Sequence, residues 1–199
     1  MIVTKLEELT KGKVKVYIDG EYHFLLYRKD INTYKLQENE MIQEKVYEEI
    51  IQDTVLRRAK QKAMAILKYM DRTEQELRQK LKQAEYTESI TESAIEYVKM
   101  FHYLDDKRFA ANYIRYKKDT KSKRQLQTEL MQKGIRKEFI EQAFEEEYDD
   151  EDLAIQKAIA KKTVDIDSLP QEEKMKLASS LYRKGFKMDK IQKYIKIYY

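Results

Sequence analysis

Residues 122–135 read SKRQLQTELMQKGI, and the same pattern recurs before and after them in the chain. Residues 73–86 read TEQELRQKLKQAEY, and residues 173–186 read EKMKLASSLYRKGF. Each copy places two leucines four residues apart, as on one face of a helix. Gly134 and Gly185 then stand where a helix cap needs a left-handed residue, and Glu85 takes that place in the first copy. This stretch therefore predicts three successive copies of one helical unit.

The three copies also agree in where their helices start and in the spacing of their core positions. Thr73-x-x-Glu76 and Ser122-x-x-Gln125 are capping boxes, and Ser168-x-x-Gln171 predicts a third, with Pro170 in the first turn of its helix. Five positions correspond, and four of them are apolar in all three copies. They are Leu77, Leu81, Tyr86, Ile90 and Ile95, then Leu126, Leu130, Ile135, Phe139 and Phe144, then Leu177, Leu181, Phe186, Lys190 and Ile195. One three-helix unit buries its apolar face poorly, so we expect the copies to stack into an elongated, curved array.

The N-terminal segment alternates with the period of a strand. Asp19-Gly20 separates two alternating runs, which is a strong hairpin signal, and Lys11-Gly12 marks a second turn. With 2–9 as a third strand, we predict an antiparallel β-meander. Beyond it, residues 29–53 are read as a transition, in which Asn39 caps a helix. That helix is expected to bury Ile42, Val46, Ile50 and Ile51.

The predicted fold is therefore mainly α: three tandem three-helix repeats preceded by a small β-meander. We set the boundaries at 1–53 for the β-rich segment with its connecting helix, then 54–104, 105–148 and 149–199 for the repeats. The composition agrees, since 38% of the 199 residues are charged while only 4 are Gly and 1 is Pro. Such a composition favours long helices with polar outer faces over a sandwich or barrel.

Composition also excludes several classes of site. The chain has no cysteine, so it contains no disulfide, thiolate metal site or cysteine nucleophile. No apolar run approaches the roughly 20 residues that span a bilayer, and the N-terminus lacks a signal-peptide pattern. We therefore expect a cytoplasmic protein that does not engage a membrane. The net charge of +4 requires any nucleic-acid contact to use local basic patches.

No pattern for catalysis stands out. The two histidines, His23 and His102, are far apart and lack metal-ligand spacing, and a packed or capping role is expected for His102. Phosphate loops and nucleophile elbows are absent from the sequence. Asp105-Asp106 is read as a helix start with favourable charge, and not as a metal site. We expect no enzyme, no cofactor, no metal and no small-molecule substrate.

Two basic clusters are the best candidate contacts. The first contains Lys117, Lys118, Lys121, Lys123 and Arg124. The second contains Arg183, Lys184, Lys187, Lys190, Lys193 and Lys196, interleaved with Tyr182, Tyr194, Tyr198 and Tyr199. Basic side chains among aromatic ones suit phosphate contact and base stacking. The alternative is a solvated face with tyrosines in the core, and Met188, Ile191, Ile195 and Tyr198 do form an apolar stripe.

Residues 145–152, EEEYDDED, are acidic at every position but one. The simplest interpretation is a solvated helix end and linker between the second and third copies. The alternative is a contact with a basic groove of a partner or mimicry of nucleic-acid charge.

Five short segments stand out along the chain, at 18–22, 72–77, 103–110, 129–135 and 183–186. In order, they resemble motifs of the RecX family of bacterial RecA regulators. YLDDKRFA at 103–110 is similar to the family signature L-D-D-x-x-F-A, and RTEQEL at 72–77 to R-S-E-x-E-L. ELMQKGI at 129–135 resembles E-L-x-x-K-G-I, RKGF at 183–186 resembles R-R-G-F, and IDGEY at 18–22 resembles the L-D-G-E-Y hairpin of Gram-positive members. KSKR at 121–124 departs from the family's K-G-R-R, and the linker 163–169 is irregular.

The resemblance implies a non-enzymatic regulator that binds RecA and its filaments on DNA. It would modulate, by inhibition, the recombinase, ATPase and coprotease activities in DNA repair, recombination and the SOS response. The signature residues are assigned structural or positioning roles: Leu104, Asp105, Asp106, Arg108, Phe109, Ala110, Lys133 and Gly134. The two basic clusters become candidate DNA or RecA contacts.

Two further functions stay open. One is a stand-alone nucleic-acid-binding module, whose binding would weaken steeply with salt. The other is a helical scaffold for an unrelated protein, which would copurify with that protein and not with RecA.

Overall fold

The computed structural model describes residues 1–197, and it divides into two compact units, Met1–Asp105 and Asp106–Tyr199. Tyr198 and Tyr199, named above beside the second basic cluster, lie outside the described residues. No helix within 1–197 is both long enough and apolar enough to span a membrane.

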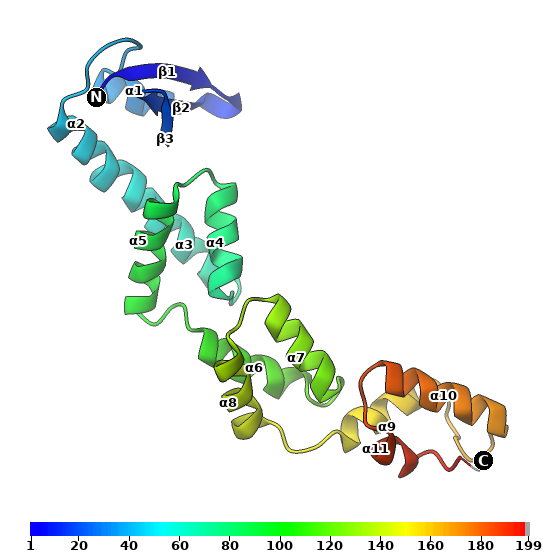
Figure 1. Ribbon diagram of the computed structural model, residues 1–199. Coiled ribbons are helices and arrows are strands. Elements are labelled where there is room, and N and C mark those ends of the chain that lie inside the picture. Colours follow the sequence, from blue (N-terminus) through cyan, green and yellow to red (C-terminus); the bar gives the residue numbers. More distant parts are fainter. Residues whose placement is uncertain (198–199) are drawn as a thin grey trace. The chain divides into compact units, whose positions relative to one another are not determined.

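A three-stranded antiparallel sheet opens the first unit (Figure 1), in the order β1 (Val3–Glu8), β2 (Lys13–Ile18), β3 (Glu21–Tyr27). Asp19 and Gly20 take φ of +50° and +89°, as a two-residue hairpin turn requires. Lys11 and Gly12 also have positive φ, in the short 3₁₀ turn Thr10–Gly12. The predicted meander is confirmed.

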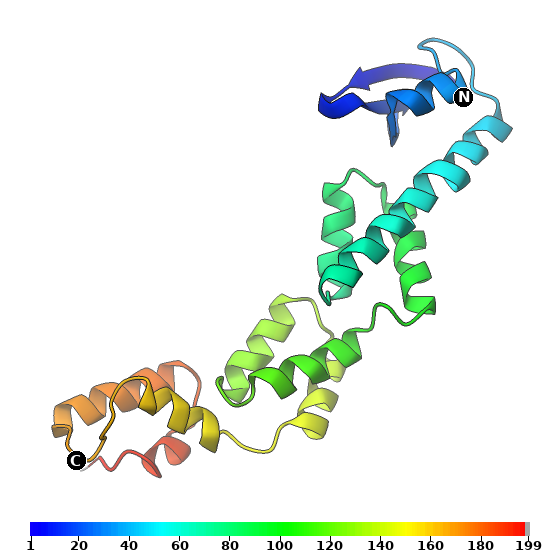
Figure 2. The same cartoon turned by 180° about the vertical axis from the view of Figure 1, so that it is seen from behind.

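The segment after the sheet is more helical than predicted. A helix, α1 (Arg28–Tyr34), follows β3 directly and has no apolar periodicity that could reveal it in the sequence. Next come α2 (Glu44–Glu49), the π-helical turn η2 (Ile50–Leu56) and α3 (Arg57–Tyr69), which run on without a break. Figure 2 shows this long helix from behind, lying across α4 and α5. The boundary set at 53/54 falls inside it.

The prediction that Asn39 caps this helix is wrong. The helix is capped at Gln43, and Asn39 takes a φ of +65° in a preceding turn. Its N–H donates to the carbonyl of Val3 at 2.7 Å, which ties the turn to the outer edge of β1. Asparagine tolerates the left-handed region as well as it caps helices, so the residue type alone does not separate the two uses.

Asp30 joins α1 to the long helix. Its carboxylate accepts from the N–H of Tyr27 at 2.9 Å and receives both terminal nitrogens of Arg58, at 2.6 and 2.9 Å. Burial raises the pKa of Asp30, but the Arg58 guanidinium and the Tyr27 N–H outweigh it and hold that pKa below its usual value. The ionised pair thus fixes the sheet segment to the first repeat.

We expect Asp30→Ala to lower the free energy of unfolding by about 2–3 kcal/mol, because it strands the partly buried Arg58 charge and removes a helix cap. Since the folded pKa is depressed, the stabilisation is present above the unfolded pKa of about 4 and is lost as pH falls through the folded value. Urea denaturation at pH 7 and pH 3 measures this. Equal losses at both pH values would contradict the ionic origin.

Nine helices form the three repeats within the described residues. The first repeat contains α3, α4 (Glu74–Gln83) and α5 (Glu88–Met100). The second contains α6 (Asp106–Lys117), α7 (Lys123–Gln132) and α8 (Lys137–Glu147). The third contains α9 (Asp152–Ala160), α10 (Gln171–Arg183) and α11 (Met188–Gln192). The mainly α fold of three three-helix units behind a small sheet is confirmed.

The capping boxes predicted from the sequence form in two of the three copies. Thr73 and Ser122 form the predicted capping boxes. The predicted box at Ser168 is wrong: Pro170 is the N-cap of α10, and the Ser168 hydroxyl donates to the Asp165 carbonyl at 3.0 Å. The left-handed caps are confirmed in all three copies, with φ of +68°, +79° and +90° at Glu85, Gly134 and Gly185.

The predicted core positions are buried, except for Tyr86 in the first copy and for the fourth position in the second and third copies. The leucine pairs Leu77 and Leu81, Leu126 and Leu130, and Leu177 and Leu181 are each 8% exposed or less. At the fourth position, Phe139 and Lys190 are only half-buried, whereas the next residue is buried in every copy. These buried residues are Thr91, Ile140 and Ile191. They lie four residues before the predicted positions Ile95, Phe144 and Ile195, which are buried in every copy.

Candidate functional site

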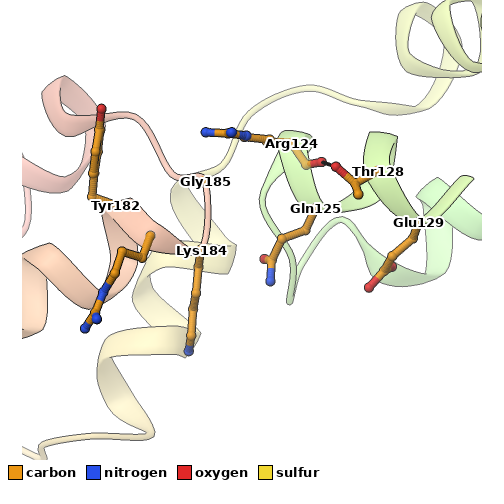
Figure 3. A pocket seen from close by; sticks show the side chains of 8 residues that line it. Arg124, Gln125, Thr128, Glu129, Tyr182, Lys184 and Gly185 are labelled. Atoms are coloured by element: carbon orange, nitrogen blue, oxygen red, sulfur yellow. Dashed lines mark hydrogen bonds between the residues drawn. The ribbon is translucent and has the colours of Figure 1, made fainter. Parts of the chain in front are cut away.

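A groove in the second unit brings basic residues of two repeats together (Figure 3). A hollow of about 470 Å³ lies between the start of α7, with Arg124 and Thr128, and the end of α10, with Tyr182, Arg183 and Lys184. A second hollow of about 320 Å³ shares Arg124 and Tyr182 and adds Lys123 and Lys187. We call these two hollows together the α7–α10 groove.

The groove is held by an interlock between the two helix ends. Ser122 accepts from the N–H of Gln125 at 3.2 Å, as a cap, and its hydroxyl donates to the carbonyl of Lys184 at 2.6 Å. Gly185 follows with a φ of +90°, and an added Cβ would lie 2.8 Å from Cβ of Arg124. Such a Cβ separation is essentially never seen, so the approach requires glycine.

Glu151 secures the start of α7 from the other side. It is 7% exposed, and its Oε1 accepts from the Lys123 N–H at 2.8 Å. A carboxylate is favourable there because the first N–H groups of a helix have no partner within the helix and carry partial positive charge. Glu151 belongs to the acidic run 145–152, so part of that run is built into the fold and is not solvated.

Other acids of the run form ion pairs. Glu147 receives Nε of Arg115 at 2.9 Å, and Asp149 lies 2.9 Å from Nζ of Lys118. These contacts stay within the second unit and neutralise Arg115 of α6 and Lys118 directly after it. The alternative role of the run, contact with a partner, stays a prediction.

The cations of the groove carry positive charge that the fold leaves open to solvent. Arg124, Arg183, Lys184 and Lys187 are exposed and, within residues 1–197, form no ion pair. Glu129, on the same wall, is engaged by Nζ of Lys121 and by the Tyr113 hydroxyl, the latter at 2.7 Å. Burial raises the pKa of Glu129, but these two partners outweigh it and hold that pKa below its usual value. Tyr182 stands among the cations with 59% of its surface exposed.

The structure redistributes the predicted basic contacts. It brings Arg124 and Lys123 of the first cluster beside Arg183, Lys184 and Lys187 of the second. The other candidates lie outside the groove: Lys117, Lys118, Lys121, Lys190 and Lys193. Lys118 and Lys121 are ion-paired, and Nζ of Lys190 lies 3.9 Å from Asp152. Their proposed contact roles stay predictions.

The signature residues lie outside the groove, and Arg108 and Gly134 are exposed while others are packed. Leu104 is 4% exposed and Ala110 is fully buried. Phe109 stacks on Tyr113 with ring centroids 6.0 Å apart, and Nζ of Lys133 lies 5.7 Å from the Phe109 ring. These contacts fit the structural role that the resemblance implies for Phe109, Ala110 and Lys133.

The two histidines lie in different segments of the first unit. His102 takes a φ of +56° just after α5 and is exposed, whereas Nδ1 of His23 lies 3.1 Å from the Tyr47 hydroxyl. His, Asp and Glu side chains nowhere gather in a group of three able to hold a metal ion in the part of the chain that the structure describes.

Comparison with known families accounts for all three repeats. Family models for the first, second and third three-helix domains of RecX match residues 59–97, 105–143 and 149–195. The chain belongs to the RecX family. The RecX domains thus cover all three repeats, whereas the sheet segment lies before the first of them.

Curated relatives carry the name regulatory protein RecX. The one from Clostridium acetobutylicum is 30% identical over 206 residues, which cover 98% of this chain and 94% of the relative. The one from Caldanaerobacter subterraneus subsp. tengcongensis is 27% identical over 195 residues, covering 97% and 98%. The family is therefore one of regulatory proteins, and it matches the chain along nearly its whole length.

Two crystal structures are similar. A regulatory protein RecX aligns with a TM-score of 0.64 and 23% identity over 98% of each chain, which shows the fold. RecX from Lactobacillus salivarius aligns with a TM-score of 0.60 and 26% identity over 70% of this chain and 93% of its own.

Proposed function

We propose that this RecX chain binds the RecA recombinase and its filaments on DNA, and that it lowers the recombinase, ATPase and coprotease activities without being an enzyme. The observation that carries the proposal is the match of all three repeats to RecX domains, together with the regulatory name of the relatives. The proposed setting is DNA repair, recombination and the SOS response.

The α7–α10 groove supports a direct contact with the DNA of such a filament. Four cations that form no ion pair within residues 1–197 surround an exposed tyrosine, and together they combine charge for phosphates with a ring face for a base. The buried Glu151 and the paired Glu129 do not cancel this charge at the groove surface. We therefore propose that the groove contacts the phosphodiester backbone while other surfaces contact RecA.

Binding to the filament tests the first part. RecA is assembled on single-stranded DNA and immobilised, and the chain is passed over it. We expect saturable binding at a stoichiometry fixed relative to RecA, weakening as salt rises because charged contacts are screened. If the chain binds bare DNA as well as it binds the RecA filament, the stand-alone nucleic-acid module is favoured instead.

A further inference from the structure

A third hollow, within the unit Met1–Asp105, has a different chemistry. It measures about 410 Å³ and lies where β2, β3, η2 and α3 meet the turn between α4 and α5. That turn is held to the sheet by the Tyr22 hydroxyl, which donates to the Glu85 carbonyl at 2.5 Å, and by Lys15, whose Nζ lies 3.1 Å from Glu85. The hollow is therefore a built feature of the unit Met1–Asp105, within the size range of ligand pockets.

Its lining combines apolar and polar surface. Leu25 of β3, Val55 of η2 and Tyr86 of the α4–α5 turn contribute aliphatic and ring surface. Arg58 also lines it, but its guanidinium is bound by both oxygens of Asp30 and lies 5.1 Å from the centre of the Tyr27 ring. Arg58 therefore lines the hollow, but Asp30 already neutralises its charge. The π-helical turn that supplies Val55 is a rare element that recurs at functional sites.

The open polar groups around this lining are hydrogen-bond donors. Lys13 and Lys62 form no ion pair with any residue in 1–197, and the Tyr86 hydroxyl likewise has no partner there. Burial raises the pKa of Tyr86, so its hydroxyl stays protonated at neutral pH and is able to donate. Apolar lining residues beside lysine and phenol donors suit a ligand that presents carboxylates beside an apolar side chain.

We infer that this hollow, the sheet–repeat pocket, binds an acidic peptide segment of the RecA partner, with an apolar side chain of that segment inserted between Leu25 and Tyr86. The inference rests on the proposed function. A nucleic-acid strand fits less well, because within residues 1–197 the pocket lining offers two lysines without an ion pair, and phosphate tracking needs a longer run of cations. The run suited to DNA is the α7–α10 groove in the other unit.

Binding of RecA in the absence of DNA tests the pocket. The variant is Lys13→Glu/Lys62→Glu. The matched control is Lys29→Glu/Lys45→Glu, which changes charge equally at two exposed lysines in the first turns of α1 and α2, where an acid is tolerated. We expect the pocket variant to weaken RecA binding about tenfold or more, and the control to leave it unchanged. Far-UV circular dichroism checks that both variants fold.

A cross-link identifies the occupant even if the double variant folds poorly. A photoreactive phenylalanine derivative replaces Gln61, which lines the pocket and is exposed. Mass spectrometry should find it joined to a RecA segment with acidic residues beside an apolar one. Cross-linking to DNA or to a basic segment overturns the inference, as does unchanged RecA binding by the folded Lys13→Glu/Lys62→Glu variant. If the wild-type chain fails to bind RecA at all, the proposed function falls with it.

Discussion

Gly185→Ala is expected to lower the free energy of unfolding by about 2–4 kcal/mol. About 1–2 kcal/mol comes from placing a Cβ on a residue with positive φ. The rest comes from steric overlap, since the new Cβ would lie 2.8 Å from Cβ of Arg124 and 3.0 Å from Oγ of Ser122. Relieving the overlap lengthens the bond from Ser122 to the Lys184 carbonyl, which contributes about 1 kcal/mol.

Gly20→Ala is the matched control. Gly20 has a φ of +89°, against +90° at Gly185, but an added Cβ there meets no atom within 4 Å. It should lose only the backbone contribution of about 1–2 kcal/mol. Urea denaturation followed by circular dichroism compares the two. If Gly185→Ala costs no more than Gly20→Ala, the two repeats are not interlocked at this point.

Removing three groove cations, with Arg124→Gln/Arg183→Gln/Lys187→Gln, is expected to weaken binding to single-stranded DNA about 100-fold at about 0.1 M salt. Each lost phosphate contact lowers the exponent of the salt dependence by about 0.7, so the slope of log affinity against log salt should fall by about 2. Fluorescence anisotropy of a labelled oligonucleotide, titrated at several salt concentrations, gives both quantities.

The control removes the same charge elsewhere in the unit, as Lys137→Gln/Lys161→Gln/Lys162→Gln, at three exposed lysines outside the groove. It should keep most of the affinity and most of the slope. Equal losses in both variants would mean that net charge, and not the groove, governs DNA binding. Tyr182→Ala tests base stacking separately from charge. Its loss should weaken DNA binding by roughly 1–3 kcal/mol without changing the slope of log affinity against log salt.

The parts of the fold that follow from local rules were predictable. Asp19-Gly20 specifies its hairpin because both residues accept positive φ, and Glu85, Gly134 and Gly185 mark equivalent helix ends in three copies. Local rules fail where one residue type has two uses. Asn39 forms a turn and not a cap, and Ser168 bonds Asp165 within a loop while Pro170 begins the helix.

The groove itself was only half predictable. Its cations stand out in the sequence, but their grouping depends on contacts between distant segments. Arg124 joins Arg183 because Gly185 lets α10 end against Ser122, whereas Lys190 turns toward Asp152. The burial of Glu151 within an acidic run could not be read from composition, since only the position of the α7 start makes a carboxylate favourable there. The sequence signal for the contact between α7 and α10 was the capping serine Ser122 together with the helix-ending pair Lys184-Gly185.

ATP hydrolysis by RecA on single-stranded DNA, measured with and without the chain at stoichiometric concentration, tests the central claim most directly. We predict that hydrolysis slows as the chain is added, and that the groove variant Arg124→Gln/Arg183→Gln/Lys187→Gln slows it less than the lysine control does. An unchanged rate at a chain concentration equal to that of RecA would contradict the account.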